Sequence, residues 1–264
     1  MDTPILDEGQ KVVALNDAIL RQQGITLPKD ARILDFGCGA GRHTYEYLDA
    51  GYARTIGFDV KDYVRLRSPE DRKYFAFPEA EGSNRIPFPD DTFDFITSTS
   101  VFEHVLHPAE VIPEIARVLK PDGATLHVFP SRWRLVEPHI HVPFGGAIQS
   151  RPWLSFWAHM GVRNEFQAGL SVQETVSRNA AYCETGIHYL TSAAIKRLWQ
   201  RHFASVAFAD RAFLQATRDV STVSRLALPF AKALPGLMPL YRTFHTCVVL
   251  ARAPASGPSR TGIG

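Results

Sequence analysis

The chain has 264 residues, 45% of them hydrophobic and 21% charged, as expected for a globular protein with one large domain or one domain with an insertion. Its net charge of +2 is too small to indicate a nucleic-acid partner. The three cysteines lie far apart and form no CxxC pair, which predicts reduced thiols and a cytoplasmic protein. No window reaches the roughly 18 apolar residues of a membrane span, so we expect no stable membrane insertion.

The first half of the chain alternates between strand and helix patterns. Apolar spacing predicts a leading helix at 10–23, stopped by Gly24, and a second helix, stopped by Gly51, from residue 42. Apolar runs predict strands at 31–36, 54–60, 73–77, 94–100 and 124–130. A further helix begins near Pro108 and presents an apolar face that ends at Leu119, before the turn sequence "KPDG". This alternation predicts an α/β fold with a doubly wound, mostly parallel sheet.

The alternation breaks after Pro130. Residues 131–190 are rich in aromatic residues, His, Pro and Gly and show no clean period, which predicts a substrate-covering insertion. The pattern then resumes with a helix capped by Thr191 or Ser192. Strands are expected near 205–209 and at 244–252.

The remaining segments complete the predicted organisation, a single domain over 1–252. A helical lead occupies 1–30, and 211–243 is a helical, apolar insertion. Its part 221–241 is cut by three prolines and is expected to cover the core or to form a homodimer contact. The small, polar residues of 253–264 predict a disordered tail.

The stretch "ILDFGCGAGRHT" (33–44) places Asp35 at a strand end, just before Gly37, Gly39 and Gly41. A dinucleotide loop of the form G-x-G-x-x-G has its third glycine one position later, and an acid would lie beside its phosphates. A cationic sulfur nucleoside explains the acid, and the glycines let the backbone pass close to the ligand. Asp59, at the end of the second strand, suits a pair of ribose hydroxyls, a device that NAD-binding folds share.

Four motifs in order, "ILDFGCGAGRHT", "IGFDV", "IPFPDDTFDFITSTSVFEHVLHP" and "EIARVLKPDGATLHV", give the chain a family resemblance. It resembles the class I S-adenosylmethionine-dependent methyltransferases, in their small-molecule branch. The resemblance implies a Rossmann-like sheet of seven strands with the last one antiparallel. It also implies S-adenosylmethionine as cofactor and S-adenosylhomocysteine as product.

The resemblance also implies which residues bind the cofactor. Asp59 would bind the ribose and Val60 would flank the adenine, Glu79 rather than Glu81 would contact the adenine, and Ser98 would lie near the methionine moiety. The full set is Asp35, Phe36, Gly37, Cys38, Gly39, Gly41, Asp59, Val60, Glu79 and Ser98.

Three histidines are catalytic candidates. His139 and His141 form an H-x-H after the fifth strand, where an imidazole could act as general base, although surface histidines of a polar loop are an equal alternative. As metal ligands they lack a third partner. His104 follows Glu103 after the fourth strand, and some relatives bind a divalent metal near such a pair. The further acids usual for that are absent here, so the pair is expected to shape the pocket floor and no metal is predicted.

These features favour methyl transfer to a hydroxyl of a small molecule, sugar or glycolipid. The hydroxyl acceptor depends on the histidines and on the absence of an N/D-P-P-Y/F motif. The insertion also resembles methyltransferases found with bacterial surface-polysaccharide biosynthesis. A quinone, phenol or natural-product acceptor, a non-catalytic cofactor-binding module and a dehydrogenase stay open as alternatives.

Overall fold

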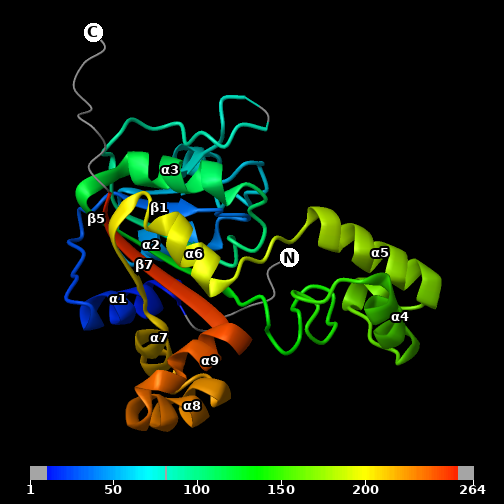
Figure 1. Ribbon diagram of the computed structural model, residues 1–264. Coiled ribbons are helices and arrows are strands. Elements are labelled where there is room, and N and C mark those ends of the chain that lie inside the picture. The colour runs from blue at the N-terminus through cyan, green and yellow to red at the C-terminus, as the bar shows by residue number, and fades with distance from the viewer. Residues whose placement is uncertain (1–10, 81, 255–264) are drawn as a thin grey trace.

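The structure is a computed structural model that describes residues 11–80 and 82–254 (Figure 1). Its centre is a seven-stranded sheet in the order β3-β2-β1-β4-β5-β7-β6. The strands pair in parallel, except that β7 runs antiparallel to β5 and β6. This confirms the predicted Rossmann-like fold with an antiparallel last strand. The strands are β1 (Ile33–Phe36), β2 (Thr55–Phe58), β3 (Phe75–Ala76), β4 (Phe93–Thr99), β5 (Leu119–Pro130), β6 (Phe203–Phe208) and β7 (Thr246–Pro254).

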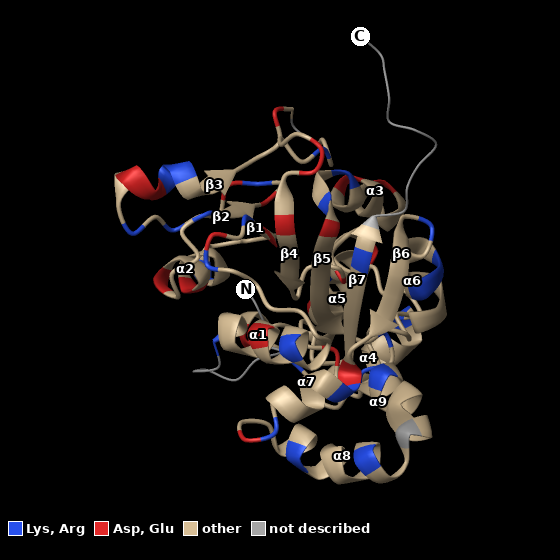
Figure 2. Ribbon diagram, turned by 90° about the vertical axis from the view of Figure 1, so that its left-hand side faces the viewer, with Lys and Arg blue, Asp and Glu red and all other residues tan. Residues whose placement is uncertain are grey.

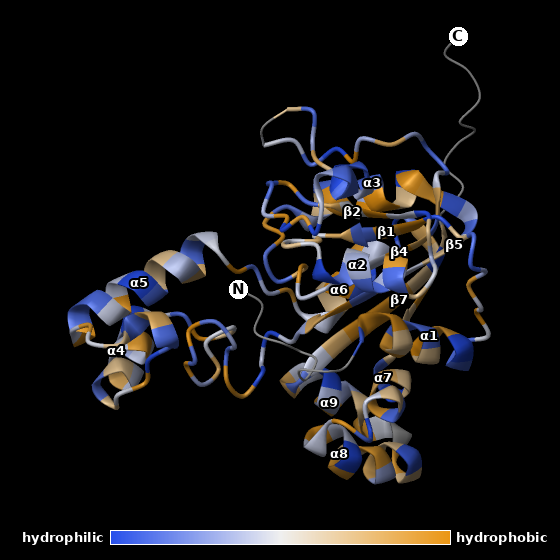
Figure 3. Ribbon diagram, turned by 180° about the vertical axis from the view of Figure 1, so that it is seen from behind, coloured by the Kyte–Doolittle hydropathy of each residue, from blue (hydrophilic) through white to orange (hydrophobic). Residues whose placement is uncertain are grey.

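Helices cover both faces of the sheet. The helices are α1 (Val12–Gln22), α2 (Arg42–Asp49), α3 (Pro108–Val118), α4 (Arg151–His159), α5 (Val172–Thr185), α6 (Ser192–Trp199), α7 (Asp210–Ala216), α8 (Thr222–Ala233) and α9 (Met238–Phe244), with 3-10 turns η1 (Pro69–Tyr74), η2 (Glu165–Gln167) and η3 (Pro235–Leu237). One apolar cluster packs α3 and α6 on the sheet through Ile115 and Trp199. A second cluster packs α1, α2 and α7 on the other face through Ile19, Tyr47 and Phe213. In Figure 3 the strands between these layers are mainly hydrophobic, which fits strands buried on both faces.

The boundary between α3 and β5 differs from its prediction. The helix ends at Val118, and the strand already begins at Leu119, so that "KPDG" lies inside β5. Leu119 pairs with Phe93, whereas Phe95 pairs with Ala124, and this irregular register absorbs the extra residues. Leu119 is fully buried, which explains why its apolar character continued the helix pattern into a strand.

The insertion after β5 is helical, where its sequence predicted an irregular stretch. Helices α4 and α5 pack on each other around a separate apolar core that includes Leu154, Ala158 and Val176. Figure 1 shows the pair projecting beside the sheet, with the residues after Pro130 leading to it. Ser171 and Glu174 form a capping box at the start of α5, which is a signal that the sequence carries. That the insertion covers a substrate stays a prediction.

The segment 211–243 folds into α7, α8 and α9, in agreement with the helical pattern. On α8, Leu228 and Ala231 are buried, whereas Leu226 and Phe230 are 64% and 63% exposed. Figure 2 shows only basic charges on this helix. A homodimer through this exposed apolar face stays a prediction.

The ends of the described chain limit two other predictions. Strand β7 continues to Pro254, so the first two residues of the expected tail belong to the sheet. Residues 255–264 and 1–10 lie outside the described residues. Among the helices of the described part, none is long and apolar enough to cross a membrane.

Candidate active site

The glycine loop joins β1 to α2 at the carboxyl edge of the sheet. The N–H groups of Gly37 and Cys38 both donate to the carbonyl of Phe58, at 2.7 and 3.0 Å. Gly37 and Gly39 have φ angles of 74° and 51°, in the left-handed region that favours glycine. The loop is therefore fixed to the end of the neighbouring strand β2, where a parallel α/β sheet places its ligands.

Packing distinguishes the glycines of this loop from one another. A Cβ at Gly37 would lie 2.5 Å from the Val101 side chain, and one at Gly41 would lie 2.8 Å from the Phe75 ring. A Cβ at Gly39 would meet nothing within 4 Å. Gly39 thus borders open space, where the backbone could lie directly against a nucleoside.

Asp59 lies against this open part of the loop. Its Oδ2 accepts a hydrogen bond from the Gly39 N–H at 2.8 Å, and its Oδ1 accepts one from the Lys61 N–H at 3.3 Å. The neighbouring Val60 is 54% exposed, so its side chain is accessible to a ligand. The acid that the sequence analysis assigned to the ribose therefore meets the glycines that let the backbone pass close to the ligand.

Asp35 is held inside the fold beneath the loop. Its Oδ2 accepts a hydrogen bond from the Thr44 hydroxyl at 2.7 Å, and the side chain is 2% exposed. Burial raises the pKa of this carboxyl, while the charge of His43 and the Thr44 hydrogen bonds oppose the rise. Asp35 thereby links β1 to the first turn of α2, and its direct role toward a bound cation stays a prediction.

Phe36 and Cys38 are also buried. The Phe36 ring stacks on Phe58 at a centroid distance of 5.7 Å. Burial raises the pKa of the Cys38 thiol far above its ordinary value, so a nucleophilic thiolate is disfavoured there. Both side chains therefore lie inside the fold, where they support the glycine loop.

Ser98 and Glu79 are placed less favourably for their expected contacts. The Ser98 hydroxyl is buried against His127 Nδ1 at 2.7 Å, and His127 Nε2 lies 2.5 Å from the Thr125 hydroxyl. Burial lowers the pKa of His127 to about 3, so this chain of hydrogen bonds is neutral. Glu79 is exposed after β3, and residue 81 lies outside the described residues. Their cofactor contacts stay predictions.

Asn16, in α1, is a buried polar residue that the sequence analysis did not single out. Its Nδ2 donates to the Tyr47 hydroxyl at 2.8 Å and to the Thr97 hydroxyl at 2.9 Å. Its Oδ1 has no hydrogen-bond partner among the residues that the structure describes. The signal available in the sequence was that Asn16 is a polar residue within the apolar face of the predicted leading helix.

The structure brings His104 and His139 together, from either side of β5. Their ring centroids are 4.8 Å apart, with the planes at 77°. His104 Nδ1 lies 2.6 Å from the Gly186 carbonyl, and His139 Nδ1 lies 2.6 Å from Glu137 Oε1. Because these oxygens can only accept, both Nδ1 atoms carry a proton, which leaves Nε2 as the nitrogen of each ring that could act as a base. Two imidazole rings this close together can accept a proton or bind a metal ion.

Glu137 orients the His139 ring and was not predicted. It is 1% exposed, and its Oε2 accepts from the N–H groups of His139 and Ile140, both at 2.7 Å. Its Oε1 also accepts from the Tyr189 hydroxyl at 2.9 Å. Burial alone would raise the pKa of Glu137, but its hydrogen bonds and the nearby His139 hold it below the ordinary value. An ionised carboxylate therefore connects the two ends of the insertion.

His141 lies on the same turn, in a different role. Its N–H donates to the Glu137 carbonyl at 2.9 Å, and its φ is 59°. The ring is half-buried and is not part of the cluster that unites Glu103, His104 and His139. A catalytic role for His141 stays a prediction.

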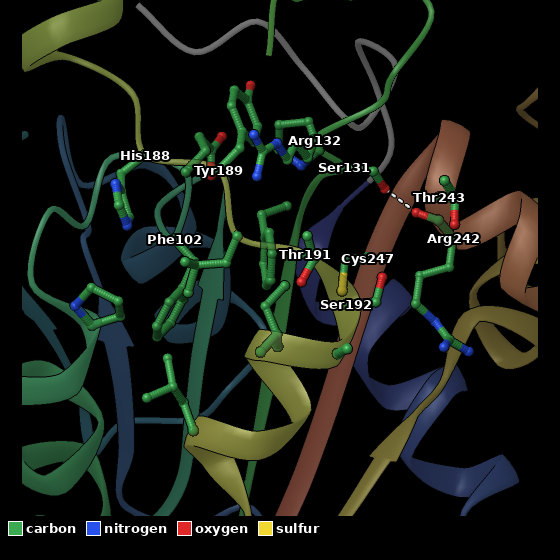
Figure 4. Close-up of a pocket in the computed structure, with 18 of the residues that line it drawn as sticks. Phe102, Ser131, Arg132, His188, Tyr189, Thr191, Ser192, Arg242, Thr243 and Cys247 are labelled. Atoms are coloured by element: carbon green, nitrogen blue, oxygen red, sulfur yellow. Dashed lines mark hydrogen bonds between the residues drawn. The ribbon is translucent and has the colours of Figure 1, made fainter. Parts of the chain in front are cut away.

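A cavity of about 280 Å³ adjoins this cluster and shares Glu103 with it (Figure 4). Apolar side chains line much of it, including Phe102, Phe129, Ile195 and Trp199. Polar side chains of its lining include Glu103, Ser131, Arg132, His188, Tyr189, Thr191, Ser192, Arg242 and Thr243. The buried Nε of Arg132 has no hydrogen-bond partner within the described part of the chain. The cavity can therefore take a molecule with an apolar body and polar or anionic substituents.

Comparison with known proteins decides the family. Residues 10–202 match the family model described as a methyltransferase domain. This chain belongs to that methyltransferase family. The match confirms the resemblance to S-adenosylmethionine-dependent methyltransferases, and the glycine loop with Asp59 fits the cofactor of that class.

Curated relatives share the sheet's motifs with this methyltransferase over part of their length. Demethylmenaquinone methyltransferase of Bacillus licheniformis is 32% identical over 106 residues, which cover 38% of this chain and 45% of that protein. Ubiquinone biosynthesis O-methyltransferase of Nitrosococcus oceani is 32% identical over 96 residues, covering 35% and 40%. The matched segment thus spans less than half of each relative.

Solved structures share the fold of the methyltransferase along nearly the whole chain. The PH0226 protein of Pyrococcus horikoshii aligns with a TM-score of 0.51 at 14% identity, covering 96% of this chain and 94% of that one. An S-adenosylmethionine-dependent methyltransferase of Mesorhizobium loti aligns with a TM-score of 0.50 at 15% identity, covering 93% and 99%. At such identities the likeness concerns the fold alone.

Proposed function

We propose that this methyltransferase methylates a hydroxyl group of a small molecule, sugar or glycolipid. The observation that carries the proposal is the contact between His104 and His139, whose ring centroids lie 4.8 Å apart in a cluster that adjoins the cavity through Glu103. S-adenosylmethionine, when bound, supplies a methyl group activated by its sulfonium. The protein then has to hold the nucleoside, position the acceptor and remove one proton.

Each of these tasks has a residue group in the described structure. Asp59 and the Gly39 backbone are suited to the nucleoside. An Nε2 atom of His139 or His104 would accept the hydroxyl proton. The buried Glu137 carboxylate, 2.6 Å from His139 Nδ1, would stabilise the resulting imidazolium.

The cavity supports two acceptor classes. Arg132 and several hydroxyls in its lining support a sugar or glycolipid with polar or anionic groups, whereas the Arg242 guanidinium is paired with Asp210. Its aromatic side chains equally suit a phenol or quinol, and relatives named for ubiquinone biosynthesis and for 2-methyl-6-phytyl-1,4-hydroquinone favour that second candidate. Arg132 distinguishes the two acceptor classes. Its Nε has no hydrogen-bond partner among the described residues, and it would bind mainly a polar or anionic acceptor.

A labelled-methyl assay tests the proposal. The protein, with methyl-deuterated S-adenosylmethionine, is offered sugar, glycolipid, phenol and quinol acceptors, and products are identified by mass. We expect label on oxygen, loss of turnover in His139→Gln with S-adenosylhomocysteine binding retained, and normal turnover in the exposed His107→Ala. Cofactor binding without turnover on any acceptor would favour a non-catalytic binding module, and label on carbon or nitrogen would exclude O-methylation.

Two broader features belong to the same proposal. The three cysteines, Cys38, Cys183 and Cys247, are buried and free, which supports a reducing, cytoplasmic location. The exposed apolar face of α8 supports a homodimer. Sedimentation of the purified protein would measure the oligomeric state.

A further inference from the structure

We infer that Glu103, His104 and His139 form a binding site for a divalent transition-metal ion. One ligand atom from each residue, a carboxylate oxygen and two imidazole nitrogens, lies within 4.8 Å of the other two. Neither sequence segment offers three such donors by itself. The turn after β4 contributes two of them, and the start of the insertion contributes the third.

The donor set and its surroundings suit such an ion. Two imidazoles and one carboxylate are the ligands of many zinc and non-haem iron sites, whereas Mg²⁺ and Ca²⁺ prefer oxygen ligands alone. Metal-binding histidines usually donate their other N–H to a carboxylate or a carbonyl, which fixes the ring. Both histidines here have that arrangement, His139 with Glu137 and His104 with the Gly186 carbonyl, each at 2.6 Å.

The geometry also defines what binding requires. Metal–ligand bonds of about 2.0–2.2 Å place ligand atoms roughly 3–3.5 Å apart, so the three groups would have to approach one another on binding. Glu103 is 1% exposed and inside the fold, whereas His104 is exposed, so the His104 ring would approach by adjusting its contact with the Gly186 carbonyl. Three protein ligands leave at least one coordination position open, as in catalytic rather than structural zinc sites.

The site adjoins the cavity that the proposed function assigns to the acceptor, because Glu103 belongs to both. A cation there would occupy the imidazole nitrogens that otherwise serve as base, and it would instead lower the pKa of a bound hydroxyl by acting as a Lewis acid. That consequence rests on the proposed function, but metal binding itself does not. A binding experiment therefore needs neither cofactor nor acceptor, and its outcome is independent of the methyl-transfer assay.

Cobalt(II) is the probe, because its visible absorption reports on the ligands. The metal-free full chain is titrated with Co²⁺, and Zn²⁺ is then added as a competitor. We expect a saturable absorption band at one Co²⁺ per chain, which Zn²⁺ abolishes. His104→Ala, His139→Ala and Glu103→Gln should each weaken binding by at least about tenfold. His107→Ala, on an exposed histidine of the same turn, should bind as the unchanged protein does.

Two results would overturn the inference. One is the absence of a saturable band in the unchanged protein, and the other is a band that both His104→Ala and His139→Ala retain. Circular dichroism of the metal-free variants checks their folding. If His139→Ala fails to fold, His139→Gln keeps a side chain of similar length, and the same titration then decides.

Discussion

At the scale of single residues, the glycine loop combines two separate requirements. Gly37 is required by the fold, because Val101 occupies the space where its Cβ would lie. Gly39 is required by neither packing nor any neighbouring side chain, since its Cβ would meet nothing within 4 Å. The space beside Gly39 is the space that Asp59 also borders, so we expect this second glycine to serve the ligand.

Substituting the two glycines should therefore separate stability from binding. Both Gly37→Ala and Gly39→Ala should lose about 1–2 kcal/mol of unfolding free energy, because alanine is strained at a left-handed φ. Gly37→Ala should lose more, from the clash with Val101. Gly39→Ala should remain folded but bind S-adenosylhomocysteine at least about tenfold more weakly, or ~1.4 kcal/mol. Denaturant unfolding and calorimetric titration measure the two effects.

Gly24 provides the matched control for backbone strain. Its φ is 73°, a Cβ there would meet nothing within 4 Å, and it lies after α1, away from the glycine loop. Gly24→Ala should be destabilised to a similar degree and should bind the nucleoside normally. Unimpaired binding by Gly39→Ala would remove the loop from the cofactor site.

The same scale shows which parts of the site the sequence could predict. Asp35, Gly37 and Asp59 belong to short motifs at strand ends, and the sheet necessarily places those ends together. His104 and His139 each stood out locally, but their contact depends on the path of the insertion. Glu137 gave no signal, because its role consists of bonds to residues on its own turn and to the distant Tyr189.

At the scale of the elements, the Glu137 carboxylate joins the two ends of the insertion. Glu137 lies where the chain leaves the sheet, and Tyr189 lies where it returns. Between them, α4 and α5 went unpredicted because their apolar residues are interrupted by polar ones. In the sheet, by contrast, short segments dominated by apolar residues predicted the strands, and their type was predicted even where the boundary at Leu119 was wrong.

Neutralising this carboxylate tests its contribution to the element. In Glu137→Gln the buried N–H groups of His139 and Ile140 would lose a charged acceptor, although a neutral carbonyl oxygen remains. We expect the unfolding free energy to fall by about 1–3 kcal/mol, the usual cost of weakening buried hydrogen bonds to a charged group. Hydrogen exchange should accelerate at residues 137–142 and near Tyr189. Chemical denaturation and exchange mass spectrometry make the measurement.

Glu165→Gln is the control, because Glu165 is exposed in η2 of the same insertion. That variant should match the unchanged protein in both measurements. Equal stability of Glu137→Gln and Glu165→Gln would mean that the carboxylate does not hold the two ends of the insertion together.

At the scale of the whole molecule, the chain carries two kinds of core. The clusters on the two faces of the sheet involve β-strands and their covering helices. The cluster inside the insertion draws its buried members from residues 140–189 alone. A unit with its own core can open while the rest remains folded, as local unfolding in native proteins does. We therefore expect the insertion to change its position beside the proposed acceptor cavity without disturbing the glycine loop.

Leu154→Ala tests this independence. Leu154 is fully buried in α4, and its truncation should cost about 2–5 kcal/mol by leaving a cavity in the insertion's core. We expect faster hydrogen exchange in α4 and α5, unchanged exchange in β1 and β4, and unchanged affinity for S-adenosylhomocysteine. Leu126→Ala, at an equally buried position of β5, should instead accelerate exchange in the sheet. If Leu154→Ala accelerated exchange in β1 and β4 as much as in α5, the sheet and the insertion would unfold as one cooperative unit, and movement of the insertion would require the cofactor loop to open with it.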